Sequence, residues 1–180
     1  MRKIKESTFE YKANSKDFLE ALINNVNYCK LLKKLKPDQS YDKLLNWIIN
    51  YNAQQEEEVL IPDLKLVYKL AGISYSHIGT NLRDIYYDIF KLNVNNPRKF
   101  SEANQKLCIL SMNYFDNIAY FRMGLDVIPN IGNKFILSFI KPILGNQTFW
   151  IKNIIHEIYD GYQLVTVEMT EYNPNIIIED

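Results

Sequence analysis

The apolar residues of this chain change their spacing part-way along it, and that change constrains the fold more than any other feature. In the first half they recur every three or four residues, as on one face of a helix. From about residue 120 they alternate with polar residues, as on one face of a strand. The stretch 93–104, rich in Asn and poor in apolar residues, separates the two patterns. The sequence therefore predicts an α+β fold, with a helical domain over residues 1–95 and a β domain over residues 105–175.

The first half is predicted to form an N-terminal helical bundle. The dipeptide Asn14-Ser15 supplies capping residues ahead of an apolar helical pattern over residues 18–35, which stops at Pro37. Ser40 is the predicted cap of the next helix. Pro62 lies in the predicted first turn of the helix after that, where a missing backbone N–H costs nothing.

The second half is predicted to form an antiparallel β meander, arranged as a small sheet or barrel. Alternating apolar residues mark strands over 121–127, 135–139 and 165–169, and turn residues occupy 129–133 and Gly145-Asn146. Asp160-Gly161 predicts a tight hairpin, because a type I′ turn needs positive φ at both central residues. Segments such as FWIKNII and FILSFI are apolar on both faces, so we expect the helical half or another chain to cover the second face.

A helix-turn-helix pattern occupies residues 67–90, VYKLAGISYSHIGTNLRDIYYDIF. An apolar helical segment ends at Ala71-Gly72, where Gly can adopt the left-handed conformation that closes a helix. Ser74 is a natural N-cap for a second helix. The apolar residues of that helix recur at helical spacing and should face the core; they are Ile78, Leu82, Ile85 and Ile89.

The segment VYKLAGISYSHIGTNL resembles the helix-turn-helix of LacI-type repressors, in which a small residue, Gly, an aliphatic residue and Ser form the turn. The continuation IGTNLRDIYYDIF is similar to the recognition helix of LuxR-type response regulators. The resemblance covers about 25 residues and implies that the second helix enters the major groove of DNA. Tyr68, where these families usually have Ala, and Gly79, within the recognition helix, depart from the pattern. The predicted DNA-binding residues are Ser74, Tyr75, Ser76, His77, Thr80, Asn81 and Arg83.

The charges of the chain are distributed unevenly. Residues 1–100 carry 16 Lys and Arg against 12 Asp and Glu, a net +4, and residues 101–180 carry 5 against 9, a net −4. A basic half joined to an acidic half is compatible with a nucleic-acid partner. The cluster Lys30, Lys33, Lys34 and Lys36 has two interpretations: it contacts DNA phosphates beside the motif, or it is the solvated face of a helix.

Several function classes find no support in the sequence. There is no nucleophile–base pairing, phosphate loop or metal-ligand spacing, so we expect no enzyme, no catalytic residue, no metal and no cofactor. His156-Glu157 lies in a predicted strand, where adjacent side chains point to opposite faces. Cys29 and Cys108 are expected to be reduced and buried. No apolar run is long enough for a bilayer and no signal peptide is evident, which predicts a cytoplasmic protein without a membrane partner.

Two functions are compatible with these patterns. The first is a DNA-binding regulatory or accessory protein, acting in transcription regulation on duplex DNA, whose β domain forms a homo-oligomer or contacts a protein partner. The second is a non-enzymatic structural or assembly protein of a phage or mobile element, such as a tail, neck or hub component. For the second, the segment FWIKNIIHEIYDGYQLVTVEM is similar to the end of phage tail-hub β-barrels.

Overall fold

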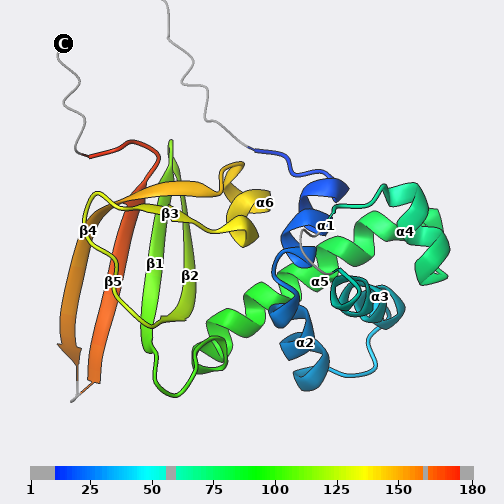
Figure 1. Ribbon diagram of the computed structural model, residues 1–180, viewed down its shortest axis with the longest axis horizontal. Coiled ribbons are helices and arrows are strands. Elements are labelled where there is room, and N and C mark those ends of the chain that lie inside the picture. Colours follow the sequence, from blue (N-terminus) through cyan, green and yellow to red (C-terminus); the bar gives the residue numbers. More distant parts are fainter. Residues whose placement is uncertain (1–10, 56–59, 160–161, 175–180) are drawn as a thin grey trace, which may run out of the picture.

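The computed structural model describes residues 11–55, 60–159 and 162–174 (Figure 1). The helices of the first half are α1 (Ser15–Ile23), α2 (Val26–Leu35), α3 (Asp42–Ala53), α4 (Leu64–Ala71) and α5 (Tyr75–Asn95). The second half contains the 3₁₀ helices η1 (Pro97–Phe100) and η2 (Ser138–Ile140), the short helix α6 (Lys141–Leu144), and the strands β1 (Lys106–Tyr114), β2 (Asn117–Leu125), β3 (Lys134–Ile136), β4 (Thr148–Tyr159) and β5 (Tyr162–Thr170). The fold is α+β, with α1–α4 at one end and the sheet at the other; α5 runs from the first toward the second, and α6 lies beside the sheet.

The helix starts show which sequence signals were correct. Asn14 caps α1 through a capping box, in which its side chain accepts from the Asp17 backbone N–H and the Asp17 carboxylate accepts from the Asn14 backbone N–H. The expected cap of the next helix is wrong, because Tyr41 precedes α3 in place of Ser40. Pro62, expected in the first turn of the helix after that, lies outside α4, just before its capping residue Asp63. The Asp63 carboxylate accepts from the Lys65 backbone N–H at 2.6 Å, as a helix N-cap does.

The single helix predicted over residues 18–35 is two helices, α1 and α2, separated at Asn24-Asn25. The Asn25 side chain donates to the Ala21 carbonyl at 2.8 Å and to Ser138 Oγ at 2.9 Å. Asn side chains compete with the backbone for such hydrogen bonds, which favours a break in a helix. The apolar spacing runs across the break, so the periodicity alone did not reveal it.

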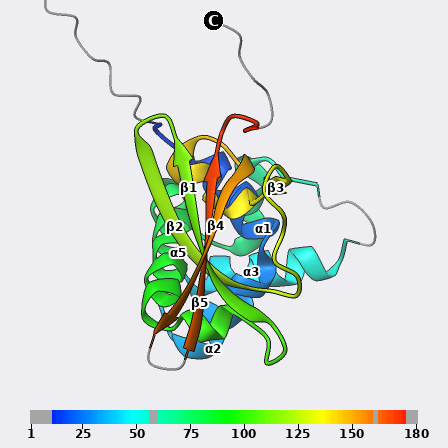
Figure 2. The ribbon, with the colours of Figure 1, turned by 90° about the vertical axis from the view of Figure 1, so that its left-hand side faces the viewer.

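The sheet is mixed and curled into a half-barrel, which corrects the predicted antiparallel meander (Figure 2). Its strand order is β2-β1-β5-β4-β3. The β1–β2, β4–β5 and β3–β4 pairs are antiparallel, whereas β1 and β5 are parallel. A meander would place β2 beside β3, but these strands form opposite edges, because the chain crosses the sheet between them and β5 returns to its centre.

The predicted strands differ in how well they match. Val165, Val167 and Met169 are buried on one face of β5, as expected. The strand predicted over 135–139 ends at Ile136, and the next residues form η2 and α6. The hairpin between β1 and β2 was not predicted, because its turn places Phe115, and no glycine, at positive φ (50°). The turn at 129–133 is present, whereas Asp160-Gly161 lies outside the described residues.

Aromatic side chains join the helices to the inner face of the sheet. Tyr86 and Phe90 of α5 contact Phe139 of η2, with ring centroids 4.7 and 5.6 Å apart, and Phe121 of β2 lies 5.3 Å from Phe139. The Tyr86 hydroxyl donates to the Phe139 carbonyl at 2.7 Å. The buried residues of both halves form one continuous core. The helical half therefore covers the inner face of the sheet on the β2 side.

Candidate nucleic-acid interface

The helix-turn-helix segment has the local geometry that the sequence predicts. Helix α4 ends at Ala71, Gly72 adopts the left-handed conformation (φ 64°, ψ 38°), and α5 starts at Tyr75. The Ile73 backbone N–H donates to the Tyr68 carbonyl at 3.1 Å and closes the end of α4. A residue with a Cβ is strained at such a φ, which explains Gly at position 72.

Helix α5 is amphipathic along its first three turns. Ile78, Leu82 and Ile85 are at most 4% exposed, and Val67 of α4 is fully buried near them in the core. The opposite face carries polar residues that are exposed to solvent. Since the buried face fixes the rotation of the helix, it also fixes which side chains point outward.

The seven residues predicted to bind DNA lie at the start of α5, and most are accessible. Ser76, His77, Thr80 and Arg83 are exposed, and Asn81 is half-buried. Ser74 occupies the N-cap position of α5, but its side chain makes no capping bond to a backbone N–H, and its hydroxyl lies 2.8 Å from Ser76 Oγ.

Tyr75 has a structural contact as well as an exposed surface. Its side chain is 52% exposed, yet its ring packs edge-on against Tyr68 at 5.2 Å. This aromatic pair occupies the position where the families that the segment resembles have a small residue, and so it explains how Tyr68 fits the turn. Gly79 lies beside α1: a Cβ there would lie 2.8 Å from Ser15 Oγ, a hydroxyl that can rotate away.

Basic side chains surround the start of α5. Lys16 and Lys65 line a hollow of about 380 Å³ together with Tyr75 and the capping residue Asp63. Lys69 on α4 and Arg83 on α5 are also exposed. The exposed charges near the turn are therefore predominantly positive, with Asp63 and Asp84 as the acidic exceptions among the described residues.

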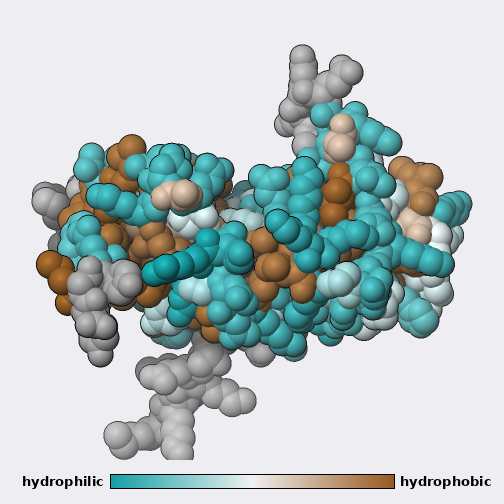
Figure 3. Space-filling model, turned by 90° about the horizontal axis from the view of Figure 1, so that it is seen from below, coloured by the Kyte–Doolittle hydropathy of each residue, from teal (hydrophilic) through white to brown (hydrophobic). Residues whose placement is uncertain are grey.

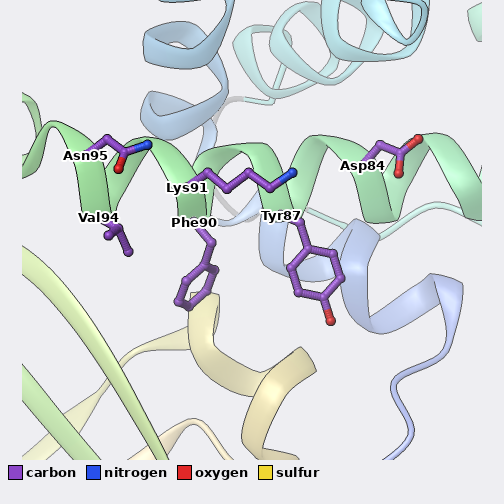
Figure 4. A pocket seen from close by; sticks show the side chains of 6 residues that line it. All are labelled: Asp84, Tyr87, Phe90, Lys91, Val94 and Asn95. Atoms are coloured by element: carbon purple, nitrogen blue, oxygen red, sulfur yellow. The ribbon is translucent and has the colours of Figure 1, made fainter.

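The outer face of α5 changes character along its length. Toward its C-terminal end, an apolar groove of about 460 Å³ is lined by Asp84, Tyr87, Phe90, Lys91, Val94 and Asn95 (Figure 4). Tyr87 and Val94 are 44% and 53% exposed, and in Figure 4 they point, with Phe90, from α5 toward α6 and the sheet. The exposed face of α5 is thus polar over its first turns and mixes apolar with polar residues toward its C-terminal end.

The lysine cluster on α2 divides into two pairs. Lys33 donates to Asn46 Oδ1, and Lys36 forms an ion pair with Asp88 at 3.2 Å, so both are held within the helical half. Lys30 and Lys34 are exposed and line a separate groove between α2 and the sheet. None of the four lies beside the α4–α5 turn in sequence or in the hollow around Tyr75.

The remaining thiol and imidazole side chains of the described residues are the two cysteines and His156. Cys29 and Cys108 are free and buried, and burial raises the pKa of the Cys29 thiol to about 12, so it stays protonated. His156 is exposed on β4 and lies 3.0 Å from the Gln163 side chain through Nδ1. Among the described residues, no three His, Cys, Asp or Glu side chains converge as metal ligands, and no helix has the length and apolarity to cross a bilayer.

A comparison of the chain with protein-family models, curated protein sequences and solved structures finds no significant match. The function must therefore be argued from the site itself.

Proposed function

We propose that this protein binds duplex DNA through the α4–α5 helix-turn-helix, with the first turns of α5 in the major groove. The observation that carries the proposal is the exposure of Ser76, His77 and Thr80 on a helix start whose opposite face is fixed in the core. DNA-reading helices of this motif contact base edges through the same N-terminal part.

The side chains at this surface suit distinct contacts with DNA. Arg83 presents a guanidinium that can pair with the O6 and N7 atoms of guanine, and Asn81 carries the amide that pairs with adenine. Ser76, Thr80 and the first backbone N–H groups of α5 are donors for phosphate oxygens. Asn81 is half-buried, so in this proposal it reads a base from the edge of the exposed face.

The surrounding charge supports the same partner. Lys16, Lys65 and Lys69 are exposed close to the turn or on α4. Lysines at such positions neutralise phosphates on either side of the DNA major groove and release counterions from the DNA. This contribution to the affinity does not depend on the DNA sequence.

In this proposal the protein is a cytoplasmic regulatory or accessory factor whose sheet forms a homo-oligomer or contacts a protein partner. The sheet half exposes large apolar residues on both edge strands, including Ile118 and Tyr120 on β2 and Ile136 on β3, which are 55%, 53% and 62% exposed. Figure 3 shows hydrophobic patches on the surface of the sheet half as well as on the helical half. Exposed apolar residues on an edge strand favour pairing with another chain.

A second candidate function is an assembly component of a phage or mobile element. The same exposed apolar residues on the strand edges favour it, because such components bind neighbours through large surfaces. Ring-shaped or stacked oligomers in negative-stain images, without DNA binding, would support this candidate in place of the first.

The test is the affinity of the full chain for DNA selected from a random duplex library. Replacing Asn81 by Ala should weaken binding to the selected sequence by about 1–3 kcal/mol through the lost base contact. Replacing Thr80 by Ala should weaken binding to all sequences alike through the lost phosphate contact. Asn113→Ala, at an exposed position on β1, is the matched control and should bind as the wild type does. If the Thr80 and Asn81 variants keep full affinity, α5 does not read DNA.

A further inference from the structure

A second groove lies on another part of the molecule, between α2, the segment that follows α5, and the end of β2. In Figure 1, α2 and the chain that follows α5 lie in the lower part of the molecule. The groove has a volume of about 460 Å³, within the range of small-ligand sites. The buried residues of α2 face the core, on the side of that helix opposite the groove. The groove adjoins the C-terminal end of α5, which at 1.5 Å per residue lies about 30 Å along α5 from Ser76.

Three lysines from two elements surround this groove. Lys30 and Lys34 are one turn apart on α2 and therefore share a face, and Lys99 comes from η1. All three are exposed, and none of them takes part in an ion pair among the described residues. Glu102 is the acidic residue that lines the same groove. The groove therefore carries an excess of positive charge that the described part of the chain does not neutralise.

Aromatic side chains form the apolar wall of the groove. Tyr28 and Phe100 line it, with ring centroids 5.2 Å apart, and both rings contact Phe121 in the core at 5.5 and 5.7 Å. Burial raises the pKa of Tyr28 to about 12, so its hydroxyl keeps its proton. These rings are anchored in the core, which fixes the wall in position. Phe100 is only 8% exposed and Tyr28 is half-buried, so the Tyr28 ring offers the larger surface on which a flat ligand can pack.

The far side of the groove is built on Gly124 of β2. A Cβ at this position would lie 2.8 Å from Gln105 Cβ and 2.6 Å from Ser101 Oγ, so only glycine lets these residues lie over the strand. Gln105 is fixed there, because its side chain accepts from the Glu102 backbone N–H at 2.9 Å and donates to Asp126 at 3.2 Å. The groove thus has a defined polar side as well as an aromatic one.

We propose that this groove binds a phosphate ester that carries a flat ring, that is, a nucleotide, either free or as a unit of a single strand. Lysine ammonium groups are suited to phosphate, and a fixed aromatic wall beside basic side chains is the arrangement by which proteins hold nucleotide bases without reading their sequence. A bare phosphate would leave the aromatic wall unused, and an uncharged nucleoside would leave the lysines unused. The site is separate from the α5 surface proposed to bind duplex DNA.

The test is calorimetric titration of the full chain with nucleoside triphosphates of the four bases, the corresponding nucleosides, inorganic triphosphate and a short single-stranded oligonucleotide. Nucleotides or the oligonucleotide should bind saturably, inorganic triphosphate more weakly, and nucleosides not at all. Tighter binding of the oligonucleotide identifies a strand as the source of the ligand, and tighter binding of a triphosphate identifies a free nucleotide.

The double variant Lys30→Gln/Lys34→Gln should weaken this binding by about tenfold or more, through the loss of two charge-assisted contacts. The matched control Lys43→Gln/Lys152→Gln removes the same charge from exposed positions on α3 and β4 and should bind as the wild type does. Thermal unfolding followed by circular dichroism establishes that both variants are folded. Absence of binding by all nucleotides and by the oligonucleotide, equal binding of nucleosides, or an equal loss in the control variant would overturn the proposal.

Discussion

Asn93, at the C-terminal end of α5, joins the helical half to the edge of the sheet. Its side chain is fully buried, its amide nitrogen donates to the Arg122 carbonyl at 2.6 Å, and its amide oxygen accepts from the Arg122 backbone N–H at 2.9 Å. Because β2 is an edge strand, this side chain supplies the two hydrogen bonds that a neighbouring strand would otherwise make.

Replacing Asn93 by Ala should lower the free energy of unfolding by about 1–3 kcal/mol for each Arg122 group left without a partner. Asn95→Ala, two residues further and exposed, should change it by no more than about 0.5 kcal/mol. Urea denaturation of both variants measures the difference. Similar losses in the two would show that the amide does not hold β2 to α5.

Asp88 is the second residue of α5 whose environment makes a clear prediction. Burial alone would raise its pKa, but hydrogen bonds from the Tyr41 hydroxyl (2.7 Å) and Lys36 (3.2 Å), together with the charges of Lys36 and Lys91, lower the pKa below its ordinary value. A lowered pKa means that the folded state favours the carboxylate. This stabilisation is complete above the pKa of the unfolded chain, about 3.9, and is lost as the pH falls through the lower folded-state value.

Asp88→Asn should therefore be less stable than the wild type at neutral pH, and the difference should shrink as the pH falls below about 4. The amide oxygen of Asn can still accept from Tyr41, so the variant mainly removes the ionic contribution. Urea denaturation at several pH values measures the gap, with Asp84→Asn on the exposed face as the control. A gap that stays constant across acid pH would contradict the assignment.

At the scale of elements, α5 carries the residues that stabilise the core on one face and the residues proposed to contact DNA on the other. Leu82 is fully buried and Thr80, two residues earlier, is exposed. Leu82→Ala should lower the free energy of unfolding by about 2–5 kcal/mol, whereas Thr80→Ala should change it by no more than about 0.5 kcal/mol. Thermal and urea unfolding of the two variants test this. A destabilised Thr80→Ala beside an unaffected Leu82→Ala would mean that the helix is rotated relative to the structure.

The same helix shows what periodicity predicts and what it leaves open. The spacing of Ile78, Leu82, Ile85 and Ile89 assigned the buried face of α5 correctly, because that face depends on local repeat alone. The break between α1 and α2 was missed, since it arises from hydrogen bonds that Asn25 makes with Ala21 and with the distant Ser138. The parallel pairing of β1 with β5 was also missed, because alternation shows which face of a strand is buried and not which strand lies beside it.

At the scale of the whole molecule, the candidate sites also differ in whether their residues are close in the sequence or are brought together only by folding. The α4–α5 surface is a contiguous segment, so its residues were evident in the sequence. The groove proposed to bind a nucleotide combines Lys30 and Lys34 with Lys99, Gln105 and Gly124. Only the packing of α2 against the sheet brings these residues together. The spacing of Lys30 and Lys34, four residues apart, was the part of this groove that the sequence alone could indicate.

The most direct test of DNA binding through α5 is the affinity of the full chain for a fluorescently labelled duplex, measured by anisotropy at increasing salt concentration. If exposed lysines around α5 contact phosphates, the logarithm of the association constant should fall linearly with the logarithm of salt concentration, with a slope of about −0.9 for each phosphate contacted. The variant Lys65→Gln/Lys69→Gln should remain folded, and its slope should be less steep than that of the wild type by the amount expected for about two phosphate contacts. A folded wild-type chain that does not bind duplex DNA at low salt, or that binds with no dependence on salt, would contradict the proposal that α5 binds DNA.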